Sequence, residues 1–438
     1  MSARLWRPAC LGLAALLLAG CAGPAPASSQ GETPPAASNG VEEHWSVLGE
    51  REERLPAVGS RWSEGPMEEV TPGPDYGELV PFIGAVCHLY YPGEDDTAFR
   101  DTYPTYLYGL MTADGQVVLD PVCTSCIQMS YDLESGGAQA LPVWKLIRGD
   151  PSSEAPFGGE LVALSALDGS WATPFQYRGA IGSPVGVFAG DSEGLALLDT
   201  AKGEEKRAWT WTQLGIDQPE YFPWLTGDAY TAAHWEGGRL YLGVWGEEGE
   251  TALLLEPESG AVTSMPAQEW YQHLETLYSQ RTWEGWVDVS ASEGGTVTVS
   301  RGEASYTFPS PLPAVYYPYA IQDRVIFQDY VFGRLAVTTL EGETVLPAQE
   351  GQLAVVETNS GNYLAVQSEA DGDWQLYNWE GRPGAILPGG PDSACQGVGP
   401  LVEVRSLDCA AYYRPDTGEC VFRTWFTLED RMEPASAP

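Results

Sequence analysis

Basic residues are scarce in this sequence. Its 438 residues include 22 lysines and arginines against 61 aspartates and glutamates, and the formal charge is −39 at pH 7. This much negative charge repels phosphate backbones and anionic lipid headgroups, which excludes nucleic-acid binding and docking to a membrane through a basic patch. The acidity favours solubility, and attraction of cationic ligands is the alternative interpretation.

Motifs of common catalytic sites are also missing. The four histidines, His44, His88, His234 and His273, are scattered, and no zinc-protease motif, P-loop or dinucleotide fingerprint occurs. Residues 190–194 match the G-x-S-x-G pattern of hydrolases, but the β-rich sequence on both sides predicts a hairpin turn instead of the required strand–turn–helix. The sequence therefore predicts no catalytic residue, metal ligand or cofactor.

Carboxylates and aromatic residues keep a carbohydrate-active site open as an alternative. Any two of the abundant carboxylates could form a glycosidase pair, so their presence alone carries little information. Residues 94–96 and 371–373 fit no known calcium loop, and we expect them in solvated turns. The aromatic residues between Trp283 and Tyr319 could stack on a sugar, although packing between strands is the favoured interpretation.

The N-terminus has the layout of a secretory signal peptide. Arg4 and Arg7 precede the apolar run Leu11–Leu18, which is far shorter than the ~20 residues of a membrane-spanning helix. The tetrapeptide ending at Cys21, Leu-Ala-Gly-Cys, resembles the lipobox of bacterial lipoproteins. That resemblance implies that residues 1–20 are removed, that Cys21 receives diacylglycerol and palmitate, and that the lipid holds the chain on the cell membrane, facing outside the cytoplasm.

The residues after Cys21 predict a flexible stalk. Residues 22–40 contain no aromatic and no large aliphatic side chain, so they cannot bury enough surface to offset the entropy of ordering. We predict a lipidated cysteine and stalk over residues 21–75, a β-domain over residues 76–430 and a disordered tail over residues 431–438.

Cys123 and Cys126 form a lone Cys-x-x-Cys motif. No second such motif and no histidine lie nearby, so a zinc site is not expected. Because export permits disulfides, a local disulfide and two free thiols are the alternatives.

A bridge between Cys409 and Cys420 is not expected. If residues 415–418 form a hairpin turn, Cys420 lies opposite Tyr413. Cys409 is then about 13 Å further along the strand, beyond the reach of a disulfide.

Glycine, proline and aromatic residues indicate an all-β fold. The chain holds 50 glycines, 34 prolines, 16 tryptophans and 22 tyrosines, as expected for many short strands joined by turns. Residues 228–264 and 353–387 each contain four short strands joined by tight turns. Four-stranded meanders that recur at about forty residues are typical of propeller blades.

Turn glycines recur along the chain with a mean spacing near 43 residues, within the ~40–50 residues of a propeller blade. They are Gly115, Gly169, Gly203, Gly260, Gly302, Gly342, Gly381 and Gly418. We predict a β-propeller of about seven four-stranded antiparallel blades, with two stacked β-domains or a solenoid as alternatives.

Residues 266–281 interrupt this β pattern. Trp270, Leu274, Leu277 and Tyr278 fall on one helical face, which predicts an inserted helix that packs on the β-domain.

Residues 108–121 resemble a WG repeat. Tyr108-Gly109 opens a strand, Asp114-Gly115 turns the hairpin, and the return strand ends at a proline. Residues 332–347 form a looser copy. The resemblance implies a binding or surface role without established chemistry.

The leading interpretation is a membrane-tethered extracytoplasmic lipoprotein that binds a protein or glycan partner without catalysis. A polysaccharide-active enzyme, with carboxylates in the propeller pocket, and a structural envelope protein are the alternatives.

Overall fold

The computed structural model describes most of the chain after residue 66. The described residues are 67–73, 76–90, 102–132, 138–149, 160–216, 233–246, 249–280, 287–292, 295–312, 318–328, 333–390, 392–406, 409–425 and 428–429. The chain divides into two units, residues 1–42 and 43–438, and every described residue belongs to the second. The predicted signal peptide, Cys21 and the predicted C-terminal tail lie outside the described residues.

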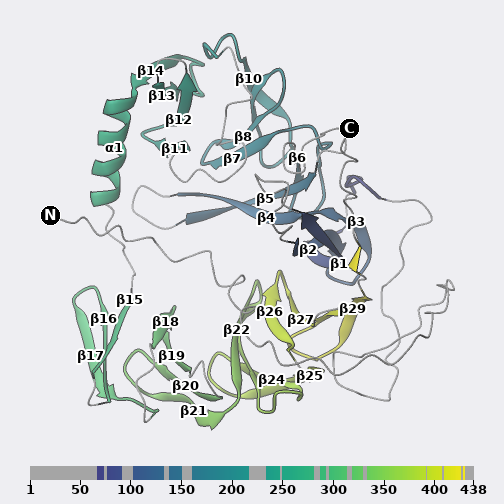
Figure 1. Cartoon of the computed structure of the whole chain (residues 1–438), viewed down its shortest axis with the longest axis vertical. Helices are drawn as coiled ribbons and strands as arrows, with labels where there is room; N and C mark the ends of the chain where they lie inside the picture. Colours follow the sequence, from purple (N-terminus) through teal and green to yellow (C-terminus); the bar gives the residue numbers. More distant parts are fainter. Residues whose placement is uncertain are drawn as a thin grey trace, which may run out of the picture. The chain divides into compact units, whose positions relative to one another are not determined.

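The chain folds as a β-propeller whose sheets are built from consecutive antiparallel strands, apart from β30, which pairs parallel with β1; the sheets are numbered in chain order (Figure 1). Sheet 1 contains β1 (Leu79–Tyr90), β2 (Thr102–Thr112), β3 (Val117–Cys123) and β30 (Leu428–Glu429), and sheet 2 contains β4 (Ser125–Asp132), β5 (Ala138–Gly149) and β6 (Glu160–Ala166). Sheet 3 contains β7 (Gly179–Ser183), β8 (Gly186–Gly190), β9 (Gly194–Leu198) and β10 (Glu205–Thr210), and sheet 4 contains β11 (Ala233–Glu236), β12 (Arg239–Gly246), β13 (Gly249–Leu255) and β14 (Val262–Pro266).

The helix α1 (Ala267–Gln280) separates sheet 4 from the second group of sheets. Sheet 5 contains β15 (Val287–Ala291), β16 (Thr296–Arg301) and β17 (Ala304–Pro309), and sheet 6 contains β18 (Tyr319–Ile321), β19 (Arg324–Gln328), β20 (Arg334–Thr339) and β21 (Thr344–Glu350). Sheet 7 contains β22 (Gln352–Thr358), β23 (Gly361–Gln367), β24 (Trp374–Asn378) and β25 (Pro383–Leu387), and sheet 8 contains β26 (Ala394–Val398), β27 (Leu401–Arg405), β28 (Cys409–Tyr413) and β29 (Cys420–Trp425).

The all-β propeller and both predicted meanders are confirmed. The meanders are sheet 4 and sheet 7, each with four neighbouring antiparallel strands. The described residues form eight sheets, against the expected number of about seven. Within them, no helix is long and apolar enough to span a membrane.

Each predicted turn glycine belongs to a different sheet. Seven occupy the turn between the last two consecutive strands of their sheet, and Gly169 directly follows β6 of sheet 2. All eight have a positive φ, from +59° at Gly302 to +92° at Gly342, a backbone conformation in which glycine avoids the clash of a Cβ. There is therefore one turn glycine for each of the eight sheets, and the eight glycines are separated by seven intervals.

Seven of these turns lie against the sheet that precedes them. A Cβ added to Gly342 would overlap the Phe308 ring of sheet 5, and one added to Gly115 would overlap the Val421 carbonyl of sheet 8. Because the sheet 1 turn lies on sheet 8, the first and last sheets are neighbours. Gly302, in sheet 5, is the exception, since nothing lies within 4 Å of its added Cβ.

Buried apolar clusters follow the same sequence of contacts. They join sheets 1 and 2, 2 and 3, 3 and 4, 5 and 6, 6 and 7, 7 and 8, and 8 and 1. Among the described residues, no buried cluster joins sheet 4 to sheet 5.

The helix α1 covers the face of sheet 4 that a following sheet would otherwise cover. Leu240 and Leu255 lie on one face of sheet 4 and pack against sheet 3. Tyr241 and Leu254 lie on the opposite face, where Trp270 of α1 packs against them and is 0% exposed. The predicted helix and its packing through Trp270 are confirmed; the side chains of Leu274, Leu277 and Tyr278 lie outside the described residues.

Sheet 5 has one apolar and one hydroxylated face. Val297, Val299 and Phe308 pack against sheet 6. The opposite face consists of exposed or half-exposed polar side chains: Asp288, Ser290, Thr298, Ser300, Ser305 and Thr307. Such a face needs no apolar cover, because a sheet can present one polar face to water.

Residues 67–73 pack on sheet 1. The Met67 amide donates to Asp120 Oδ2 at 2.6 Å, and Val70 is buried. The folded part therefore begins before residue 76.

Candidate functional site

The two cysteines singled out from the sequence connect sheets 1 and 2. Cys123 ends β3 and is buried, and Cys126 lies in β4 and is half-buried. Both are thiols, and burial raises the pKa of Cys126 well above its usual value. A disulfide between Cys123 and Cys126, the alternative to two free thiols, stays a prediction. In the described part of the chain, no group of three or more histidines, cysteines and carboxylates could hold a metal ion.

Two other sequence patterns belong to hairpins, as expected. Residues 190–194 form the turn between β8 and β9, where the Asp191 amide donates to the Gly194 carbonyl at 3.0 Å. The structure thus excludes a nucleophile elbow there. Cys420 lies opposite Tyr413 in the β28–β29 pair, which confirms the register that argued against a bridge to Cys409.

Polar side chains converge where sheets 1, 2 and 8 meet. We call this group the junction cluster; its members are Tyr106 and Tyr108 on β2, Cys126 on β4, Gln396 on β26, Glu403 and Arg405 on β27, and Tyr412 on β28. Alternation along β27 explains its composition. Val402 and Val404 face sheet 7, so Glu403 and Arg405 face sheet 1.

Glu403 is a buried carboxyl at the centre of this cluster. Its side chain is 3% exposed and accepts hydrogen bonds from Gln396 Nε2 and the Tyr412 hydroxyl, both at 2.8 Å. The Tyr412 hydroxyl in turn accepts from the Ile83 amide at 2.8 Å. One phenol therefore links the last sheet to the first, across 329 residues of sequence.

Burial raises the pKa of Glu403 above its usual value, because desolvation disfavours the charged form. The positive charge of Arg405 and the hydrogen bonds from Tyr412 and Gln396 oppose that shift. Burial and the neighbouring Glu403 also raise the pKa of Tyr412, so its hydroxyl stays protonated. A desolvated carboxyl beside a specific cationic partner is a common feature of functional sites.

Arg405 is one of the partly exposed members of the cluster, with Tyr106, Tyr108 and Cys126, and Gln396 is exposed. Its Nε lies 3.9 Å from Glu403 Oε1, its guanidinium carbon lies 4.7 Å from the centre of the Tyr106 ring, and its side chain is 21% exposed. Toward the described residues, the guanidinium makes no hydrogen bond of ordinary length. Stacking on an aromatic ring holds the guanidinium flat and leaves its edge available.

Tyr108 brings the cysteine motif into the same neighbourhood. It pairs with Cys123 across β2 and β3. Burial, followed by the charge of Glu403, raises the pKa of Tyr108; Arg405 opposes the shift, and Cys126 adds to it. The junction cluster thus offers one guanidinium and the protonated hydroxyls of Tyr108 and Tyr412 around a single buried carboxyl, with the Cys126 thiol near Tyr108.

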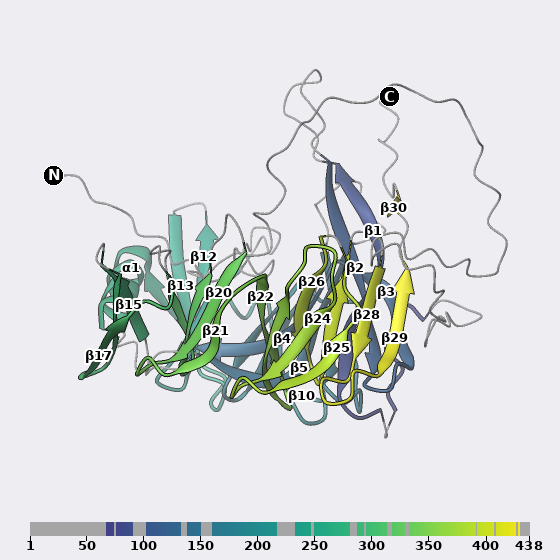
Figure 2. The same ribbon diagram turned by 90° about the horizontal axis from the view of Figure 1, so that it is seen from below.

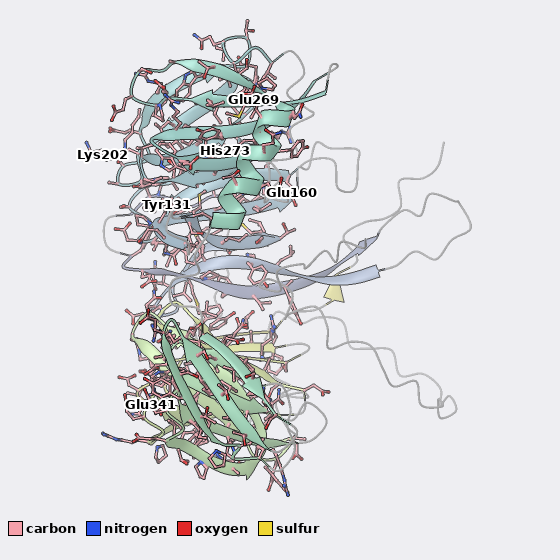
Figure 3. The ribbon with its side chains drawn as sticks, turned by 90° about the vertical axis from the view of Figure 1, so that its left-hand side faces the viewer. Tyr131, Glu160, Lys202, Glu269, His273 and Glu341 are labelled. Carbon is pink, nitrogen blue, oxygen red and sulfur yellow. The ribbon has the colours of Figure 1, made fainter. Side chains whose placement is uncertain are left out.

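A second polar group, on α1, has a structural role. His273 Nε2 lies 2.7 Å from Glu236 Oε2, and the imidazole stacks on Tyr241 with ring centres 5.1 Å apart. Trp270 stacks on the same tyrosine, and Figure 3 shows His273 on the helix beside sheet 4. This stack holds α1 on the sheet.

Sequence reasoning missed Glu403, Arg405 and the two tyrosines as a group. The available signal was a charged residue inside the apolar strand 401–405, Leu-Val-Glu-Val-Arg, where a core strand would carry only apolar residues. Of the aromatic residues considered for sugar stacking, Tyr319 is 36% exposed, and those from Trp283 to Tyr317 that were singled out lie outside the described residues.

Known proteins resemble this chain only distantly. No protein-family model and no curated protein matches it. Among solved structures, the dihydro-heme d1 dehydrogenase NirN in complex with DHE shares 12% identity over 86% of this chain and 76% of that chain, with a TM-score of 0.30. Apo AztD from Citrobacter koseri shares 10% identity over 80% and 96%, with a TM-score of 0.29. Kluyveromyces lactis Hsv2p shares 9% identity over 54% and 74%, with a TM-score of 0.20. Similarities at such TM-scores carry no information on what this chain binds.

Proposed function

We propose that this protein is a lipid-anchored extracytoplasmic binding module that holds a protein or glycan partner at the junction cluster. The lipobox-like Cys21 and the stalk after it support the anchor, and they lie outside the described residues. In this proposal the anchor holds a folded domain outside the cytoplasm, and that domain binds its partner without catalysing a reaction.

One observation carries the binding role. Arg405, 21% exposed, stacks on the Tyr106 ring and lies beyond hydrogen-bond distance of Glu403, whose oxygens already accept from Gln396 and Tyr412. A partly exposed guanidinium that is held on an aromatic ring can still donate to a partner, which favours recognition at this cluster.

The same cluster favours binding over glycoside hydrolysis. Glycosidases of the usual type need two carboxyl groups, one on each side of the bond that breaks. Glu403 is the one carboxyl that influences Tyr108, Arg405 and Tyr412 among the described groups. A polysaccharide-active enzyme remains the second candidate; sustained release of reducing ends from a glycan panel by the mature domain would establish it instead.

Removal of the lipid site tests the anchor. The Cys21→Ser variant should move from the membrane fraction to the soluble fraction, because two acyl chains supply the membrane affinity. Cys10→Ser, which changes a cysteine inside the predicted signal peptide, is the matched control and should stay with the membrane. Retention of Cys21→Ser on the membrane would contradict the proposal.

Removal of one hydroxyl tests the place of binding. The mature domain is screened against glycan and envelope-protein panels, and each bound partner is measured again with Tyr108→Phe and with Tyr377→Phe of sheet 7 as control. We expect binding to fall with Tyr108→Phe alone. A wild-type domain that holds no partner in either panel would favour the structural envelope role.

A further inference from the structure

We propose that Arg405 recognises a carboxylate on the partner, and that the class of ligand at the junction cluster is a hydroxylated acid such as a uronic acid. The proposal rests on the proposed function, since it names the chemistry that the same cluster binds. It is carried by the geometry of one guanidinium and its three neighbours.

The guanidinium is fixed in place on two sides. The Tyr106 ring covers one face at 4.7 Å, and Nε points toward Glu403 Oε1 at 3.9 Å. Neither contact is a hydrogen bond, so the partly exposed guanidinium can still donate to a ligand. Two parallel N–H groups of a planar guanidinium match the two oxygens of a carboxylate, which makes such pairs both strong and directional.

Glu403 does not use up this guanidinium. Its Oε1 accepts from Gln396 and its Oε2 accepts from Tyr412, while its distance from Arg405 Nε exceeds that of a hydrogen bond. Burial raises the pKa of Glu403, which weakens the competition that its charge presents to an incoming anion. Arg405 thus keeps positive charge to offer.

The surroundings favour a monoanion with hydroxyl groups. A dianion such as phosphate meets stronger repulsion from a chain of charge −39 than a carboxylate does. Tyr108, whose raised pKa keeps its hydroxyl neutral, can donate to or accept from a sugar hydroxyl.

Titration of the mature domain with three probes tests this inference. The probes are D-glucuronate, D-glucose and inorganic phosphate. The variants are Arg405→Gln, Arg405→Lys and the control Arg334→Gln, at the exposed first residue of β20. We expect glucuronate to bind the wild type best. Arg405→Gln should weaken that binding at least ~10-fold, Arg405→Lys should weaken it less because charge is kept without the fork, and Arg334→Gln should leave it unchanged.

Several results would overturn the inference: no glucuronate binding by the wild type, tighter binding of phosphate or glucose, or equal glucuronate affinity in Arg405→Gln. Thermal unfolding of each variant shows whether it is folded. If Arg405→Gln is unfolded, the glucuronate affinity of Arg405→Lys tests the inference instead. If a partner binds through Tyr108 while glucuronate does not bind, this inference fails and the proposed function stands.

Discussion

The junction between sheets 8 and 1 differs from the junction between sheets 4 and 5. At the first, an apolar cluster, the Tyr412–Ile83 hydrogen bond and an ion pair of Arg414 with Asp114 join strands from the two ends of the domain. The parallel pairing of β30 with β1, drawn at the long β1–β2 hairpin in Figure 2, adds a backbone contact. At the second, α1 covers sheet 4 and sheet 5 presents hydroxyl groups.

This difference shows that the side chains on each sheet face determine whether another sheet packs against it. Apolar faces must be covered, so a sheet or a helix has to follow each of them. A face of serine and threonine side chains can remain in contact with water, so no further sheet or helix has to cover it. The closed junction joins strands about 300 residues apart, and the polar groups that specify this closure also form the candidate site.

The largest expected effect comes from the two turn glycines at these junctions. Gly115→Ala places a Cβ at φ +85° and against the Val421 carbonyl, so the free energy of unfolding should fall by ~3 kcal/mol from backbone strain and overlap together. Gly302→Ala, at φ +59° in open space, should cost only about 1 kcal/mol. Urea unfolding of both variants measures the difference; equal losses would mean that sheet 1 does not rest on sheet 8.

A smaller effect is expected from the phenol that bridges the closed junction. Tyr412→Phe removes the hydroxyl between Glu403 and the Ile83 amide and leaves both buried groups short of a partner. The free energy of unfolding should fall by ~2 kcal/mol. Tyr377→Phe, half-buried in sheet 7, is the matched control and should change stability by less than about 0.5 kcal/mol. Similar values for the two variants would show that the phenol does not stabilise the junction.

The sequence predicted the fold far better than the site. Strands, turns and α1 are local features, read from alternation, from glycine at positive φ and from the helical spacing of Trp270. The predicted number of about seven blades is one below the eight sheets of the described residues, because eight turn glycines define only seven intervals. The hydroxylated face of sheet 5 was visible as alternating serine and threonine, but its meaning depends on which sheet follows.

The junction cluster could not be read from the sequence because its members are distant. Tyr108 and Arg405 meet only when the first and last sheets pack together, and without related sequences no pattern links them. The Cys-x-x-Cys motif identifies Cys126 in the sequence, but no motif identifies the residues that surround it in the structure. The buried Glu403 inside an apolar strand was the one local sign of a polar function.

The smallest expected effect is a pH dependence centred on Glu403. Its pKa in the folded protein is raised above the unfolded value near 4.5, so protonation favours the folded state. That stability is fully present below the unfolded pKa and is lost as pH rises through the folded pKa, and each tenfold difference in proton affinity between the two states contributes about 1.4 kcal/mol. Glu403→Gln should remove this loss. Unfolding of both proteins from about pH 4 to about pH 8 should therefore show a growing advantage for the variant; a constant difference would contradict the assignment.

Amide hydrogen exchange tests the central contrast between the two junctions most directly. The Ile83 amide is buried and bonded to Tyr412, whereas β15 forms part of the hydroxylated face of sheet 5, which no described sheet covers. We predict that β1 around Ile83 and β28 exchange among the slowest segments of the domain, and that β15 exchanges much faster. Exchange around Ile83 as fast as in β15 would contradict the closure of the domain through its first and last sheets.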